Sequence, residues 1–439
     1  MSETILIRGG HLIDPAAGVD APTDLLIQDG KVARTGAPGT LSGTHEIDAG
    51  GCHVLPGLVD THAHLREPGL EYKETIADAA RNAVAHGITR LFAMPNTDPV
   101  CDNVAVCELV RARGRAAGAA HVLPVGALTR DMAGKVLSEM GELADNGCPA
   151  VSDAWVPIES SQMMRRALEY AKGVGLPVIT VPQDLGLSGN GVMHEGPIST
   201  RLGLRGIPAA SEEIPVSRAI ALAELTGCPI HISPLSTAGS VRMVAAAQRR
   251  GVPVTAGTSP MYLDLTDERL LSYDTNAKVY PPLRPRRDVE VLRQALADGT
   301  LGTLTSCHAP HAAYEKEVEF DHAPFGVAGL ATALSLTLKL VEEKVVDLST
   351  AVARWTVGPR EAFGEAAGPA TLAEGALADL TVADLSATWE VTPEVAHNTP
   401  YLGHTLTGRV RHTLVAGQPV FSASEPNHEP AMKAAGDTP

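Results

Sequence analysis

The stretch HVLPGLVDTHAHLREPG, residues 53–69, joins a short apolar run to two histidines. His62 and His64 are two positions apart, so on a strand their side chains point to the same face. Two imidazoles on one face at a strand end can bind one transition-metal ion. The stretch therefore predicts a strand with metal-binding chemistry at its carboxyl end.

Alternating helical and strand-like runs surround this stretch over residues 56–365. Examples are DAARNAVAHG followed by TRLFAMPN (78–96), RRALEYAKGVG followed by PVITVPQD (165–184), and VRMVAAAQRRG followed by VPVTAGTSP (241–260). Repeated βα units indicate a parallel sheet, and about 300 residues of them fit a (β/α)8 TIM-type barrel. A doubly wound open sheet is disfavoured because no GxGxxG motif follows the first strand. The α/β barrel places its active site at the carboxyl ends of the strands.

The two ends of the chain have a different texture, in which short β-like runs alternate with turns. TILIRGG (4–10) and DLLIQDGKVARTG (24–36) resemble GALADLTVAD (375–384) and GRVRHTLVAGQPVF (408–421) in this respect. We expect residues 1–55 and 366–422 to form one small β-sandwich domain. Residues 423–439 are polar and rich in proline, which is typical of a mobile tail.

Composition narrows the possible classes of protein. The formal net charge of −16 opposes nucleic-acid binding, which requires an excess of Lys and Arg. No run approaches the roughly 20 apolar residues of a membrane helix, and MSETILIRGG lacks the features of a signal peptide. The six cysteines form no CxxC pair and are expected to be free thiols. These features predict a cytoplasmic protein that binds neither nucleic acid nor membrane.

Six motifs in order resemble those of class I dihydroorotases, in the amidohydrolase superfamily: VDTHAHLREPG, FAMPNTDPV, HEGPISTRLGLRGIPAASEE, YDTNAKVYPPLRP, HAPH and EKEVEFDHAPFGVAGL. The resemblance spans residues 3–421. It implies a metal-containing (β/α)8 barrel with a small β-sandwich made from both chain ends. It also implies a pyrimidine precursor as substrate, since the family interconverts N-carbamoyl-L-aspartate and L-dihydroorotate in pyrimidine biosynthesis.

Several functional positions of the family are retained. His62 and His64 match its HxH metal ligands. The resemblance further implies substrate contacts through Arg66, Asn96, His311, Phe325 and Gly326.

Other positions depart from the family. The remaining ligand positions that we can align hold Ala154, Val181, Pro234 and Cys307, of which Cys307 replaces the family's catalytic aspartate. Tyr280 replaces a substrate-binding asparagine. Alanine, valine and proline side chains have no donor atom for a metal, and a catalytic zinc site uses about three protein ligands. No catalytic residue is intact, and we expect the binuclear centre to be absent.

The leading interpretation is therefore a dihydroorotase-like chain whose family activity is weak or lost. The resemblance implies aspartate carbamoyltransferase as a partner, because non-catalytic dihydroorotase homologues assemble with that enzyme. We expect either a homo-oligomer or a hetero-oligomer. Changes fall on positions at the barrel mouth, whereas the apolar runs and turn glycines are undisturbed.

Two alternatives keep an enzyme. In one, His62, His64 and Cys307 hold a single zinc ion as a His2Cys set and support a mononuclear amidohydrolase. In the other, the chain is an active zinc dihydroorotase with displaced ligands, for which Asp153, Asp184 and His231 are the candidates. Each residue also has a structural interpretation, since histidines can be satisfied polar groups and aspartates can cap turns.

Overall fold

The strand of the histidine stretch is the first of a barrel in the computed structural model, which describes residues 4–423. Its parallel strands follow each other around the barrel in chain order, and β10 and β11 together make the third strand. The barrel closes where Ala63 pairs in parallel with His308. The strands are β8 (Leu58–Ala63), β9 (Ile88–Ala93), β10 (His121–Pro124), β11 (Gly126–Ala127), β12 (Val151–Ser152), β13 (Val178–Thr180), β16 (Ile230–Ile232), β17 (Val254–Thr258) and β18 (Thr303–Leu304).

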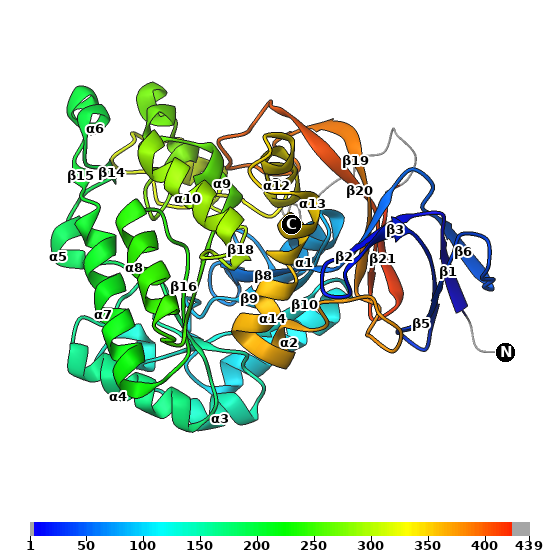
Figure 1. The fold of residues 1–439 in the computed structure, drawn as a ribbon. Coiled ribbons are helices and arrows are strands. Elements are labelled where there is room, and N and C mark those ends of the chain that lie inside the picture. Colours follow the sequence, from blue (N-terminus) through cyan, green and yellow to red (C-terminus); the bar gives the residue numbers. More distant parts are fainter. Residues whose placement is uncertain (1–3, 424–439) are drawn as a thin grey trace, which may run out of the picture.

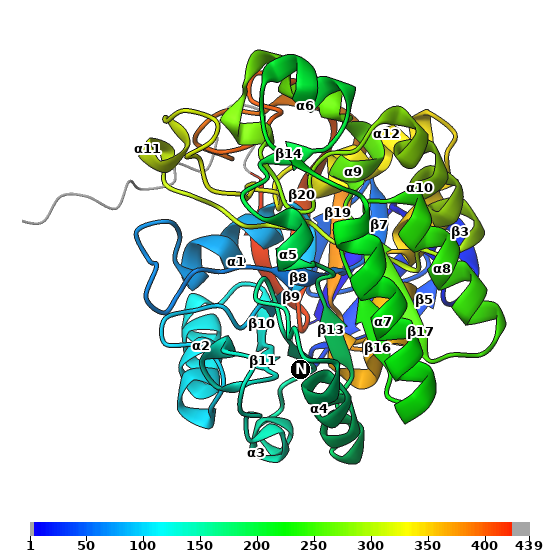
Figure 2. The same cartoon turned by 90° about the vertical axis from the view of Figure 1, so that its left-hand side faces the viewer.

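Helices between the strands cover the outside of the barrel (Figure 2). Polar side chains start several of them, as at Thr75, where Oγ1 accepts a hydrogen bond from Asp78 N and caps α1. Gly118 ends α2 in the left-handed conformation that glycine adopts without strain. The longer helices of the barrel are α1 (Ile76–Ala85), α2 (Val104–Ala117), α3 (Met140–Asp145), α4 (Ser161–Gly173), α7 (Ala210–Thr226), α8 (Ala238–Arg249), α10 (Arg286–Asp298), α12 (Ala333–Glu342), α13 (Leu348–Ala353) and α14 (Val357–Phe363).

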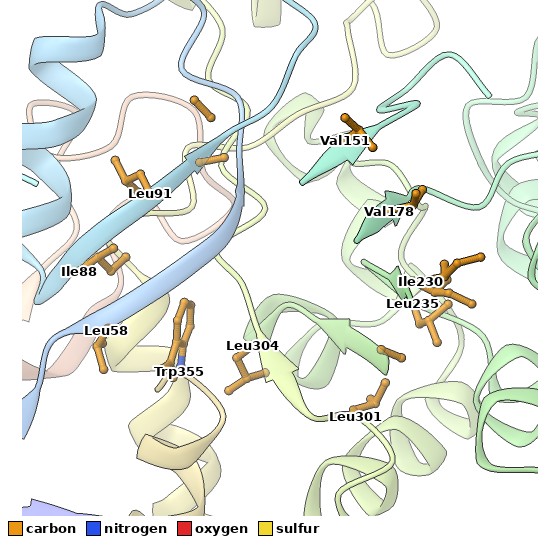
Figure 3. Packing of buried hydrophobic residues seen from close by; sticks show 14 of the residues in the cluster. Leu58, Ile88, Leu91, Val151, Val178, Ile230, Leu235, Leu301, Leu304 and Trp355 are labelled. Carbon is orange, nitrogen blue, oxygen red and sulfur yellow. The ribbon is translucent and has the colours of Figure 1, made fainter. Parts of the chain in front are cut away.

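The two faces of each barrel strand have different neighbours, as a period of two residues requires. Val178 and Ile230, which pair across β13 and β16, face the helices and belong to the largest apolar cluster (Figure 3). Ile179 and His231 are the next pair along the same strands. Ile179 packs instead with Phe92 in a separate cluster inside the barrel. Strand alternation thus decides which side chains enter the barrel.

Short elements between the longer ones build the barrel mouth. They are α5 (Leu185–Ser188), β14 (Met193–His194), α6 (Pro197–Leu202), β15 (Gly206–Ile207), α9 (Pro260–Asp264) and α11 (Ala313–Lys316), with the 3-10 turns η1 (Arg130–Met132), η2 (Asp267–Ser272) and η3 (Thr275–Ala277). The turn η4 (Gly364–Ala367) follows α14 and contacts Arg90 of β9 instead.

Strands from both chain ends form the second part of the molecule, which lies beside the barrel at the right of Figure 1. One sheet has the order β5-β4-β1-β6 and the other β21-β20-β19-β7-β2-β3. In the second sheet, β7 of the N-terminal end pairs with β19 of the C-terminal end. The bounds are β1 (Thr4–Arg8), β2 (His11–Asp14), β3 (Val19–Pro22), β4 (Asp24–Gln28), β5 (Lys31–Gly36), β6 (His45–Asp48), β7 (His53–Pro56), β19 (Leu380–Glu390), β20 (Thr405–Val415) and β21 (Gln418–Ser422).

The architecture confirms the predicted fold class, an α/β barrel with a β-sandwich built from both ends. The mobile tail expected over 423–439 lies, apart from Ala423, outside the described residues. Between residues 4 and 423, no helix combines the length and the apolar composition needed to cross a bilayer.

Candidate functional site at the barrel mouth

The imidazole rings of His62 and His64 meet at the carboxyl end of β8. Their Nε2 atoms lie 3.2 Å apart, within hydrogen-bond distance. Two nitrogens bound at about 2.0–2.1 Å to one tetrahedral ion would lie about 3.3 Å apart. The pair therefore has the spacing of two ligands to a single ion, as the HxH pattern predicts.

Both rings are buried and neutral at physiological pH. Burial lowers the pKa of His62 to about 4. The pKa of His64 lies well below its ordinary value, because of burial and because His62 and Arg66 are close. Asn96 Oδ1 lies 2.6 Å from His64 Nδ1, whereas His62 Nδ1 is buried without a hydrogen-bond partner. Both histidines are therefore present as uncharged bases.

A third ligand is not brought to this pair. Among residues 4–423, no three His, Cys, Asp or Glu side chains form a group able to hold a metal ion. Cys307 packs in an apolar cluster with Met261 and Tyr262, and its thiol interacts with Ser259. Burial, with the nearby Asp60 carboxylate, raises the pKa of the Cys307 thiol. In this arrangement the Cys307 thiol contacts Ser259 and does not form a metal-binding group with the two histidines.

The other three aligned ligand positions are buried and apolar. Ala154 packs in the barrel interior with Phe92 and Ile179. Val181 follows β13, and Pro234 lies just beyond β16; both are buried. These positions add packing at the mouth and no donor atom.

Displaced ligands do not replace them. Asp184 caps α5, its carboxylate accepting a hydrogen bond from Leu187 N at 3.0 Å. Asp153 lies 3.4 Å from the Thr180 hydroxyl, and burial raises its pKa to about 7. The nitrogens of His231 lie near two other hydroxyls inside the barrel. Among the described residues, these three do not form a metal-binding group with the histidine pair.

Four of the five residues expected to contact substrate lie together, whereas the fifth, Asn96, lies against His64. Arg66 Nε donates to Pro310 O at 2.9 Å, and its Nη2 lies 3.3 Å from His311 Nε2. The same His311 nitrogen lies 2.9 Å from Phe325 O. Gly326 follows in this loop with φ +147°, where an added Cβ would lie 2.4 Å from Ala309 O. Arg66, His311, Phe325 and Gly326 are thus brought together, largely by contacts with one another and with their neighbours.

Aromatic side chains pack against two of the retained residues. The Trp155 ring lies 4.7 Å from the His64 ring, and the Tyr280 ring lies 5.7 Å from that of Phe325. A separate cavity of about 10 Å³ is lined by Ser259, Met261 and other residues, and none of the retained family residues lines it.

Two contacts were not predicted, one between buried His308 and Glu74 and one between partly buried Lys73 and Glu315. His308 Nε2 lies 2.6 Å from Glu74 Oε2, and Lys73 Nζ lies 2.9 Å from Glu315 Oε1. Lys73 Nζ also lies 3.1 Å from His311 Nδ1. The EYKE run, which supplies Lys73 and Glu74, lies just after the histidine motif. Charged residues so close to the end of the histidine strand could have indicated that they belong to the site.

Solved structures share this fold. The L-hydantoinase of Arthrobacter aurescens superimposes with a TM-score of 0.85 over 96% of each chain, at 22% identity. The dihydropyrimidinase of Brevibacillus agri NCHU1002 gives a TM-score of 0.79 over 96% of this chain and 95% of that chain, also at 22% identity. At such identities the likeness concerns the fold alone.

Sequence relatives are more specific. The Dihydro-orotase-like family model matches residues 51–240. The dihydroorotase of Anaeromyxobacter sp. (strain K) is 51% identical over 428 residues, which cover 95% of this chain and 98% of the relative. That of Geobacter sp. (strain M21) is 48% identical over 427 residues, covering 95% and 99%. The predicted family is confirmed, and this chain belongs to the dihydroorotase family.

Proposed function

We propose that this chain serves pyrimidine biosynthesis as a non-catalytic member of its family. It would not interconvert N-carbamoyl-L-aspartate and L-dihydroorotate at an enzymatic rate. Its role would be to associate with aspartate carbamoyltransferase as a folded partner chain.

The observation that carries the proposal is the shortage of donor atoms around His62 and His64. His64 contacts Asn96 and the Trp155 ring, and among the described residues no third His, Cys, Asp or Glu side chain forms a metal-binding group with the pair. Two imidazoles fall below the roughly three protein ligands of a catalytic zinc site. Cys307, at the position of the family's proton acceptor, is a neutral buried thiol. Loss of a positioned general base alone typically costs ~10²–10⁴ in rate.

Aromatic packing at the mouth supports the same conclusion independently. Trp155 and Tyr280 pack against His64 and Phe325, which the resemblance assigns to metal and substrate. Large rings at these positions would reduce the room for a pyrimidine precursor. Removal of the donors and filling of the space therefore act in the same direction.

The intact fold argues that the chain still has a role. The apolar cluster between barrel and helices is continuous from Leu58 to Trp355, and both sandwich sheets are formed. A chain released from all selection would accumulate damage in such positions, since most core changes destabilise by about 0.5–3 kcal/mol. This pattern fits selection that maintains the folded chain but no longer maintains its catalytic residues. Binding to a partner protein would be a reason for such selection.

Activity is tested by cyclisation of N-carbamoyl-L-aspartate with and without added zinc. The dihydroorotase of Anaeromyxobacter sp. (strain K), assayed in parallel, is the positive control. We expect no rate above the protein-free background at either metal concentration. A rate within tenfold of the control would overturn the proposal that the chain is non-catalytic.

Metal content gives a second readout that does not depend on turnover. After purification without chelators, we expect much less than one zinc per chain. One or more tightly held ions per chain, lost in His62→Ala, would instead favour a working metal site. His322→Ala is the matched control, because His322 is exposed and far along the chain from the pair.

Partnership is tested by mixing the purified chain with aspartate carbamoyltransferase of the same organism at micromolar concentration. In analytical size exclusion we expect both proteins in one earlier peak. Two unshifted peaks would overturn the partnership and leave the activity result untouched.

A further inference from the structure

Three cysteine thiols meet outside the barrel mouth. Cys101 Sγ lies 3.1 Å from Cys107 Sγ, and Cys107 Sγ lies 3.4 Å from Cys148 Sγ. Cys101 precedes α2, Cys107 lies in the first turn of α2, and Cys148 follows α3. All three are buried. We refer to these three residues as the thiol cluster.

We propose that the thiol cluster is a reversible oxidation site, in which a peroxide converts Cys107 and one neighbouring cysteine into a disulfide. The Cys101–Cys107 pair is the first to form, and Cys148 is the alternative partner of Cys107. This inference does not depend on the proposed function.

The sulfur–sulfur distances favour a disulfide over a bound metal. Two thiolates on one tetrahedral zinc, each at about 2.3 Å, lie about 3.8 Å apart. The separations of 3.1 and 3.4 Å are shorter, and the described residues contain no group able to hold a metal ion. A disulfide requires the sulfurs of Cys101 and Cys107 to approach by about 1 Å more.

The surroundings of Cys107 make it the nucleophile. The contacts with the thiols of Cys101 and Cys148 lower its pKa, and the Arg111 guanidinium lowers it further, against the effect of burial. The thiolate is the reactive form of cysteine, and positive neighbours and a helix start favour it. The contact with Cys107, together with burial, raises the pKa of Cys101.

The chemistry balances with peroxide as the oxidant. The Cys107 thiolate attacks one peroxide oxygen, the O–O bond breaks, and hydroxide leaves and takes up a proton to become water. The resulting sulfenic acid is attacked at sulfur by the Cys101 thiol, which loses its proton as a second water departs. Two thiols are oxidised by two electrons, and one peroxide is reduced to two waters.

A surface cavity lies next to the cluster. It measures about 250 Å³ and is lined by Asp102, Asn103 and Leu143, among others. Asp102 and Asn103 connect Cys101 to α2, and Leu143 O accepts the backbone hydrogen bond of Cys148 at 3.1 Å. A molecule as small as hydrogen peroxide thus has space beside Asp102, which follows Cys101, and beside Leu143, whose backbone bonds to Cys148.

A disulfide between Cys101 and Cys107 would link the segment that precedes α2 covalently to the first turn of α2. Cys101 N donates to Pro95 O at 3.0 Å, and the next residue, Asn96, bonds to His64. The disulfide would therefore anchor the segment that positions Asn96.

The test is differential alkylation and peptide mapping of the whole chain after treatment with dilute hydrogen peroxide. We expect two of the six thiols to become resistant to alkylation, linked as Cys101–Cys107 or Cys107–Cys148, and to be restored by dithiothreitol. Cys52 and Cys228, which have no neighbouring thiol, should remain alkylatable although Cys52 is more exposed.

Serine variants separate the possibilities. Cys107→Ser should abolish both links, Cys101→Ser should leave only Cys107–Cys148, and Cys148→Ser should leave only Cys101–Cys107. Cys228→Ser, another buried position, is the control and should change nothing. A full set of free thiols after peroxide, or oxidation centred on Cys52 without a linked peptide pair, would overturn the proposal.

Discussion

At the scale of a residue, His231 shows what burial does to a histidine inside the barrel. Its nitrogens lie 2.9 Å from Thr255 Oγ1 and 3.3 Å from Thr303 Oγ1. Burial, with a smaller effect of His62, lowers its pKa to about 3. The unfolded chain therefore binds this proton near pH 6.5 and the folded chain does not, so stability falls as pH drops from about 6.5 towards 3. Between pH 7 and 5 the share of His231 in this loss is about 2 kcal/mol.

The variant His231→Gln keeps a polar group and removes the titration. In urea titrations at pH 7 and pH 5, the variant should lose about 2 kcal/mol less free energy of unfolding between the two values than the parent chain. His322→Gln, at an exposed position, should leave the pH dependence as it was. Equal pH dependence in all three proteins would contradict a neutral buried His231.

At the scale of an element, the start of α7 is anchored by a buried carboxylate. Glu212 accepts hydrogen bonds from Ser236 N at 3.1 Å and Thr237 N at 3.0 Å, and it pairs with Arg284 at 3.5 Å. Arg284 Nη1 also lies 3.0 Å from His194 Nδ1. Glu212→Gln leaves the buried guanidinium without a counter-charge, and we expect a loss of about 3–5 kcal/mol in the free energy of unfolding.

The same helix supplies the control. Glu224 pairs with Arg250 at 3.2 Å, but both side chains are about half exposed. Glu224→Gln should cost less than about 1 kcal/mol. If both variants lost similar amounts of unfolding free energy in urea titrations, burial would not explain the contribution of the Glu212–Arg284 pair to stability.

At the scale of the whole molecule, Asp379 joins the barrel to the sandwich. Its carboxylate accepts a hydrogen bond from Ala416 N of the sandwich at 2.7 Å. From the barrel, Arg90 of β9 and His121 of β10 each lie 3.3 Å from it. Asp379→Asn removes the charge that Arg90 faces, so we expect a loss of about 3–5 kcal/mol. Hydrogen exchange should also become faster in β20 and β21 than in the barrel strands.

Glu46→Gln in the other sheet is the matched control, because its pair with Arg8 is exposed. It should change stability by less than about 1 kcal/mol and leave the exchange pattern unaltered. Uniformly faster exchange in the Asp379→Asn chain would mean that this carboxylate supports global stability and is not a link between the two parts.

Local sequence patterns were sufficient to predict the fold and part of the candidate site. The two-residue period of strands sends Val178 and Ile230 to the helices and brings His62 and His64 to one face. The cap at Asp184 is likewise local, since its carboxylate reaches only three residues along the chain. Motifs in order placed Arg66, His311 and Phe325 in one site before their contacts were visible.

Contacts between distant residues were decided by the tertiary structure alone. The spacing of residues in the sequence does not reveal that the Trp155 ring packs against His64 or that the Cys307 thiol interacts with Ser259. It also does not reveal that the Cys148 thiol contacts that of Cys107. The sequence by itself determined which residue types stand at the strand ends, because periodicity and capping act over a few residues. Only closure of the barrel decided which of those side chains meet, because their directions depend on packing between segments far apart in the chain.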